Sequence, residues 1–92
     1  MKQETAEAIA LQALGWIAGQ EDLMGAFLGA TGADLDTVRA RAEEPEFLVS
    51  VLEFLTMDDE WVVGFCDAAG IAYDTPMRAR AALPGGAEMH WT

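Results

Sequence analysis

Apolar side chains recur every three or four residues along most of this chain, which is the spacing that gathers them on one face of an α-helix. The strongest case is residues 45–55, where the i, i+3, i+4 and i+7 positions are Leu48, Val51, Leu52 and Leu55. Further apolar residues on the other sides leave mainly Ser50 and Glu53 polar. A helix that is apolar nearly all round is a buried helix, so we expect this segment to be central and Leu52 to be fully buried.

The same periodicity predicts four or five further short helices around that centre. Acidic residues or proline mark their starts, and glycine marks most of their ends. They are expected from Glu4 to about Ala18, from Glu21 to Thr31-Gly32, from a cap at Asp34 or Asp36 to about Ala42, from about residues 56–60 to Gly70, and from Thr75 to Leu83. In the third of these, Leu35 is expected to face inward. Because no segment alternates as a strand would, we expect an all-α bundle of five to six short helices around residues 45–55.

The length of 92 residues allows one hydrophobic core of ordinary size. No linker or internal repeat interrupts the helical pattern, so residues 1–86 are expected to form a single helical domain. Pro84-Gly85-Gly86 ends the last helix. Residues 87–92 show no periodicity and are expected to form a flexible C-terminal tail.

Sixteen acidic residues against five basic ones give the chain a formal net charge of −11. This charge repels the phosphates of nucleic acids and anionic membrane surfaces, so neither is an expected partner. The N-terminus lacks the basic start and apolar block of a signal peptide, and the single cysteine cannot form an internal disulfide, so we expect a cytoplasmic protein. Most acids lie near predicted helix starts, where they complement the helix dipole. The alternative role for them is a cation site or a surface for a basic partner.

Residues able to carry catalysis are few and scattered. Glu53 could form a dicarboxylate pair with Asp59 or Glu60, but nothing in the sequence singles out the desolvated carboxyl group that such chemistry needs. Cys66 lies on the apolar face of its helix, and the lone histidine, His90, lies in the expected tail. A Cys–His pair or a zinc site is therefore disfavoured. We expect no catalytic residue, no metal, no cofactor and no enzymatic activity.

The residues singled out for interaction are Trp16 with its neighbours Gly15 and Gly19, and also Trp61, because tryptophan is enriched in protein interfaces. Trp16 and Ile17 are about 100° apart on their helix, and Ile17 lies nearer the line of alanines that marks the buried face. Trp16 is therefore expected at the edge of that face. The spacing of Gly15 and Gly19 also allows another helix to approach closely. The alternative is that the second helix covers Trp16, whose role is then packing.

A series of short patterns spans nearly the whole chain. They are Ala8-Ile9-Ala10 with Ala13-Leu14-Gly15, Phe27-Leu28 with Thr31-Gly32, Pro45-x-Phe47-Leu48-x-x-Val51-Leu52-x-Phe54-Leu55, Asp59-Glu60, Phe65, Gly70, Arg80 and Leu83. On these residues the chain resembles a small alphaproteobacterial family of uncharacterised all-helical proteins, a domain of unknown function. Trp61 and Cys66 depart from the family's pattern. The resemblance implies a bacterial cytoplasmic helical domain and transfers no activity.

The function expected from the sequence is protein–protein interaction, as a small acidic adaptor or regulatory domain. Its partner would be another, unidentified protein or a second copy of the chain. One alternative is a helix-turn-helix protein associated with nucleic acid, although the predicted helices over 45–55 and from about residues 56–60 to Gly70 carry no basic residue. Another is an acidic mimic of DNA, which would need carboxylates spaced along one face.

Overall fold

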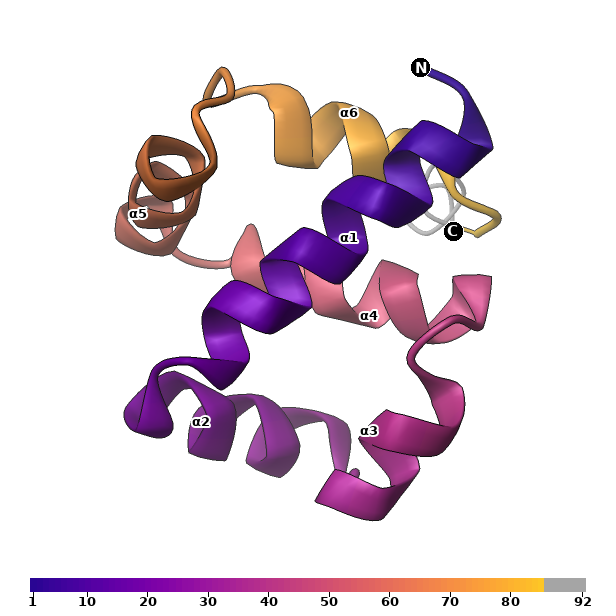
Figure 1. Ribbon diagram of the computed structural model, residues 1–92, viewed down its shortest axis with the longest axis vertical. Coiled ribbons are helices and arrows are strands. Elements are labelled where there is room, and N and C mark those ends of the chain that lie inside the picture. Colours follow the sequence, from indigo (N-terminus) through magenta and orange to yellow (C-terminus); the bar gives the residue numbers. More distant parts are fainter. Residues whose placement is uncertain (86–92) are drawn as a thin grey trace.

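Six α-helices joined by short turns make up residues 1–85, which are the residues that the computed structural model describes (Figure 1). The helices are α1 (Gln3–Ala18), α2 (Glu21–Thr31), α3 (Leu35–Arg41), α4 (Pro45–Leu55), α5 (Asp59–Ala69) and α6 (Thr75–Ala82). No strand occurs in this part of the chain, and the all-α fold is confirmed. The expected domain end at residue 86 and the expected tail, 87–92, lie outside the described residues.

Helix α4 has the bounds and the burial that its pattern predicted. Pro45 is its first residue, where the missing N–H of proline costs nothing. The buried side chains of α4 point to all sides and are Phe47, Leu48, Val49, Val51, Leu52, Phe54 and Leu55. Leu52 has 0% of its surface exposed, so its expected burial is confirmed.

Helix α1 shares the centre with α4, which its sequence did not predict. It crosses α4 diagonally and also contacts α2, α5 and α6 (Figure 1). Its inner face carries three fully buried alanines, Ala6, Ala10 and Ala13, followed by Ile17. Short side chains let two helix axes lie close together. An alanine-rich face therefore marks a close crossing, although it gives only a weak hydrophobic signal.

Glycine is required by the backbone at two of the predicted helix ends. Gly32 and Gly70 close α2 and α5 with φ of 72° and 71°, in the left-handed region that other residues avoid. After Gly70, the amide of Ile71 donates to the carbonyl of Cys66 at 3.1 Å, as expected for a Schellman ending. Gly19 ends α1 with an ordinary φ of −76°, so the turn there does not need a glycine.

The short helix α3 does not bury the residue expected at its start. Leu35 is 52% exposed, whereas Val38 is buried. A helix of seven residues has only two turns, and α3 packs lightly on its neighbours through Val38. Leu35, the first residue of α3, therefore lies beyond the packed part of the helix, and the expectation that it faces inward was wrong.

Acidic residues gather at the helix N-termini as the sequence indicated. Seven lie in first turns, namely Glu4, Glu21, Asp22, Asp36, Glu46, Asp59 and Glu60, and four occupy N-cap positions, namely Asp34, Glu44, Asp58 and Asp74. Asp34 is the residue that caps α3, where its Oδ1 accepts a hydrogen bond from the Thr37 amide at 2.8 Å.

Candidate functional site

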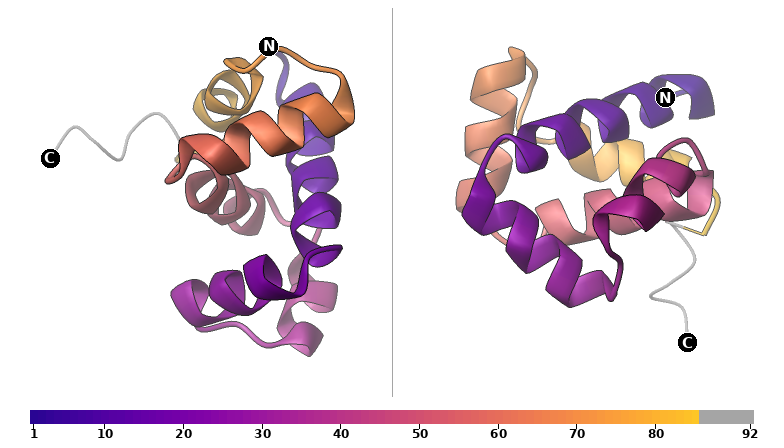
Figure 2. Two further views of the ribbon diagram at one scale, coloured as in Figure 1. Left: turned by 90° about the vertical axis from the view of Figure 1, so that its left-hand side faces the viewer. Right: turned by 60° about the horizontal axis from the view of Figure 1, so that its bottom comes forward.

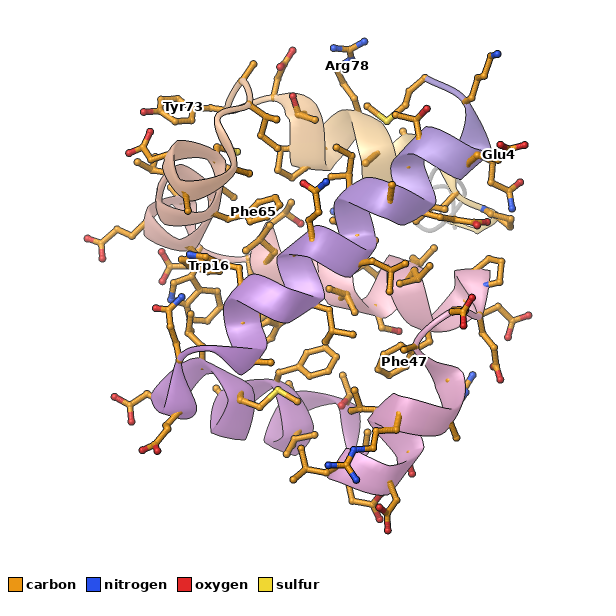
Figure 3. All side chains as sticks on the ribbon, in the orientation of Figure 1. Glu4, Trp16, Phe47, Phe65, Tyr73 and Arg78 are labelled. Atoms are coloured by element: carbon orange, nitrogen blue, oxygen red, sulfur yellow. The ribbon has the colours of Figure 1, made fainter. Side chains whose placement is uncertain are left out.

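Trp16 packs against α5. Its ring lies 6.1 Å from that of Phe65, with the two planes at 59°, and Figure 3 shows the two side chains meeting between α1 and α5. A Cβ atom placed on Gly64 would lie 2.9 Å from Cζ2 of Trp16, so the indole occupies the space that a side chain at 64 would need. The tryptophan is half-buried and lies at the edge of the α1 face on which Ile17 is buried in the core. Helix α5 therefore covers part of the indole, whereas the alternative expected α2 to cover it.

Gly64 is a residue that the sequence reasoning missed. The sequence could have indicated it, because a glycine inside a helix costs about 1 kcal/mol relative to alanine and is therefore often explained by a close packing contact. Gly15, which the sequence singled out for a close approach of another helix, lies beside open space. A Cβ on Gly15 would meet nothing within 4 Å, and the same holds for Gly25 and Gly29, so no other helix of residues 1–85 approaches them closely.

Trp61 begins a row of aromatic rings that crosses the core. Its indole stacks on Phe54 at 4.7 Å with an interplanar angle of 23°. Phe54 meets Phe27 edge-on at 5.4 Å, and Phe27 meets Phe47 in the same way at 5.8 Å. One face of the half-buried Trp61 is therefore used for packing, and its role as an interaction anchor stays a prediction.

A groove lined by apolar side chains lies between α1, α2 and α3 and has a volume of about 350 Å³. Figure 2 (right) brings α2 and α3 forward beneath α1. The lining residues are Leu11, Leu14, Gly15, Ala18, Met24, Leu35, Val38, Arg39 and Ala42. Leu11 and Leu35 are 40% and 52% exposed, so both can contact a bound molecule. Because glycine has no side chain, nothing projects from Gly15 of α1 into this groove.

The groove separates the residues that the sequence grouped together. Gly15 lines the groove, whereas Trp16, about 100° further around the helix, faces α5 and a different hollow that it shares with Phe65. Gly19 lines neither. Leu11 and Leu35 are the residues from which this groove could have been predicted, because a leucine at the margin of a predicted buried face can point into the core or into a surface groove.

A second pocket, which we call the Glu53 pocket, lies between the end of α2 and the second half of α4. Its volume is about 290 Å³, and Ala30, Thr31, Ser50, Glu53, Phe54 and Met57 line it. The Oε2 atom of Glu53 is buried and has no hydrogen-bond partner among residues 1–85. Met57 is 76% exposed and stands at the rim. The sequence reasoning named Glu53 only as a partner of Asp59 or Glu60, but neither of these lines the pocket, and both are exposed.

Cys66 lies in the core and is held as the neutral thiol. It has 0% of its surface exposed, and its Sγ donates to the Ala72 carbonyl at 3.4 Å. Burial raises the pKa of Cys66, and the negative charges of Asp67 and Asp74 raise it further. A thiol with a raised pKa is a poor nucleophile. His90, the other member of a Cys–His pair, lies outside the described residues.

Among residues 1–85, no group of three or more histidine, cysteine, aspartate or glutamate side chains is placed to hold a metal ion. Within the same range, none of the helices has the length and apolar character needed to cross a lipid bilayer.

Comparison with known proteins places the chain in one family. Residues 3–86 match the family described as Protein of unknown function (DUF3572), and the chain belongs to that family. No curated protein and no solved structure matches it.

Proposed function

We propose that this DUF3572 protein binds another protein, as a small acidic adaptor or regulator, and that the groove between α1, α2 and α3 receives an amphipathic helix of the partner. The observation that carries the proposal is the apolar groove with two accessible leucines at its edges. Amphipathic helices bind such grooves through apolar anchors spaced three or four residues apart. A groove of about 350 Å³ is large enough for a few such side chains.

The net charge of the chain indicates what charge the partner's helix should carry. At a net charge of −11 the protein attracts a basic partner and repels a second copy of itself. We therefore propose a basic amphipathic helix from a different protein rather than self-association. Arg39 is the one charged residue in the groove lining and has no ion pair with another residue of 1–85, so it suits a single acidic side chain on that helix.

Binding is proposed in preference to the other functions because of the chemistry of the groove. An apolar lining does not hold the phosphates of nucleic acid, and the groove offers no convergent set of polar groups for catalysis. We place the protein in the cytoplasm of a bacterium, and its source among the alphaproteobacteria. The lone cysteine and the family resemblance support this placement.

A display library of helical peptides tests the proposal directly. Peptides are selected on the wild-type protein, and the affinity of each enriched peptide is measured by fluorescence anisotropy against four variants. Leu35→Ala and Leu11→Ala alter the groove. Met77→Ala and Val63→Ala are matched controls, because Met77 and Val63 are 51% and 39% exposed but lie on α6 and α5.

Each groove variant should weaken binding about fivefold, because removing a leucine that is half-exposed before binding loses about 1 kcal/mol of apolar contact. The control variants should change the affinity by less than about twofold. The enriched peptides should be basic and amphipathic. Peptides that bind equally to the groove variants and to the control variants would show that the groove is not the docking site.

A further inference from the structure

We infer that α3 is a movable wall of the groove between α1, α2 and α3, which swings away from α1 to admit the partner's helix and then closes on that helix. The inference rests on the proposed function for the identity of the occupant, whereas the opening of α3 is a property of the free chain. Its basis is a groove that admits side chains but not a helix, next to a short helix that few interactions hold in place.

Two of the residues that line the groove are almost buried. Leu14 of α1 and Val38 of α3 belong to its lining, yet each has only 8% of its surface exposed. An α-helix with its side chains is about 10–12 Å across. A volume of about 350 Å³ holds a few side chains rather than the body of a helix. For the partner's helix to pack against Leu14, α3 therefore has to move away from α1.

Few interactions oppose that movement. Val38 is the single buried side chain of α3, and the helix lies at a corner of the bundle, between the end of α2 and the start of α4 (Figure 1). Among residues 1–85, no hydrogen bond or ion pair joins α3 to α1 or α2. An element with so few buried contacts opens at a lower free energy than the core does.

The polar contacts of α3 with the start of α4 place the pivot at its C-terminal end. Nε of Arg41 donates to Oε1 of Glu44 at 2.9 Å, and the guanidinium carbon of Arg41 lies 5.9 Å from the centre of the Phe47 ring. At the other end, a short non-helical link that begins at Gly32 joins α3 to α2. Such links absorb the dihedral changes of a hinge. Leu35 lies at this N-terminal end and therefore moves furthest.

The movement matters for binding because α3 carries groups that contact the partner. Leu35, which is 52% exposed, and Arg39 both belong to α3 and line the groove. When α3 closes, these two side chains add their contacts to those that α1 makes with the docked helix. The closed position is then favoured by the bound partner, which is a shift between two states of the same chain.

The test measures how often Val38 becomes accessible, by labelling a Val38→Cys variant with a maleimide dye and locating the label by peptide mass spectrometry. The internal reference is the native Cys66, which is 0% exposed and needs no substitution. The matched control is Val51→Cys, the same change at a residue of α4 that is also 0% exposed. Each rate is divided by the rate for the same thiol in the unfolded chain. Position 38 should then be labelled at least about a hundredfold faster than position 51 and Cys66; equal rates would overturn the inference.

The dependence on urea separates the opening of α3 from other routes to the label. The slope of the logarithm of the labelling rate against urea follows the surface that opening exposes. At position 38 this slope should be positive but smaller than the slope for global unfolding. A slope of zero would show that the label reaches the position without any opening. A slope equal to the global one would show that α3 leaves only when the whole chain unfolds, and either result overturns the inference.

A peptide selected for the groove tests the closing. At ten times its Kd, the peptide should slow labelling at position 38 about tenfold, because it binds the closed form. Unchanged or faster labelling in the presence of a peptide that Leu35→Ala weakens would overturn the inference. If no peptide is selected, the proposed function fails. Slow labelling of position 38 in the free chain contradicts the movable wall alone, so the two failures are distinguishable.

Discussion

The contact between Trp16 and Gly64 gives a prediction in which two known effects oppose each other. Gly64→Ala replaces a glycine in the interior of α5, which alone stabilises a helix by about 1 kcal/mol. The new Cβ, however, would lie 2.9 Å from Cζ2 and 3.4 Å from Cη2 of Trp16. Overpacking of this kind costs about 1–3 kcal/mol, because the indole has to move against Phe65. We therefore expect Gly64→Ala to lower the free energy of unfolding by about 0–2 kcal/mol.

The matched control is Gly25→Ala in α2, where a Cβ meets nothing within 4 Å. This variant gains the helix propensity without the clash and should be more stable than the wild type by about 1 kcal/mol. In a chain of this size, that gain raises Tm by about 4–8 °C. The two glycine variants should therefore differ by about 1–3 kcal/mol in stability, although the chemical change is the same.

The assay is urea denaturation of the wild type, Gly64→Ala, Trp16→Ala and the double variant, analysed as a double-mutant cycle. Trp16→Ala alone should cost about 2 kcal/mol, roughly half of what a fully buried tryptophan loses. In that background the clash is gone, so Gly64→Ala should become stabilising by about 1 kcal/mol. If Gly64→Ala stabilises the wild type as much as Gly25→Ala does, or if the cycle shows no coupling, Trp16 does not pack on Gly64 and is free to serve as a surface anchor.

Two further predictions concern the core and the cap of α3. Leu52→Ala should reduce the free energy of unfolding by about 2–5 kcal/mol in urea denaturation, because Leu52 has 0% exposure; a loss near zero would refute its central place. Asp34→Ala should lower Tm at neutral pH, because the hydrogen bond from the Thr37 amide holds the pKa of Asp34 below its ordinary value. That stabilisation is present above the unfolded-state pKa and is lost as the pH falls through the folded-state pKa, so thermal melts of the two proteins should converge in acid; a constant difference would contradict the cap.

The elements that sequence periodicity predicted best are those whose signal is local. The bounds of α4 follow from Pro45 and from the apolar run that ends at Leu55. Gly32 and Gly70 end their helices because glycine adopts the required positive φ without steric cost. Leu52 could be placed in the core because α4 is apolar on every side, so any packing arrangement buries it. These conclusions do not depend on which helix lies next to which.

What the sequence did not show depends on packing between helices. Leu35 has the right spacing to face inward, but α3 is too short and too lightly packed to bury its first residue. Periodicity places Trp16 at the edge of a buried face, but it does not say that α5 covers that edge. Glu53 was visible as one of three polar residues on α4, with Glu46 and Ser50, yet the lack of a donor for its Oε2 among residues 1–85 follows only from the packing around it.

Three glycines inside α1 and α2 are not required by the packing of residues 1–85. Gly15, Gly25 and Gly29 each cost about 1 kcal/mol relative to alanine, and the space beside each is empty. Folding of residues 1–85 therefore gives no reason for a glycine at these positions. For Gly15 the groove gives one, because a methyl group there would project into the groove where a docked helix would approach Leu11 and Ala18. Nothing in the structure explains Gly25 or Gly29. If Gly15→Ala stabilises the protein and also weakens the selected peptides, the glycine is retained for binding at the expense of the helix.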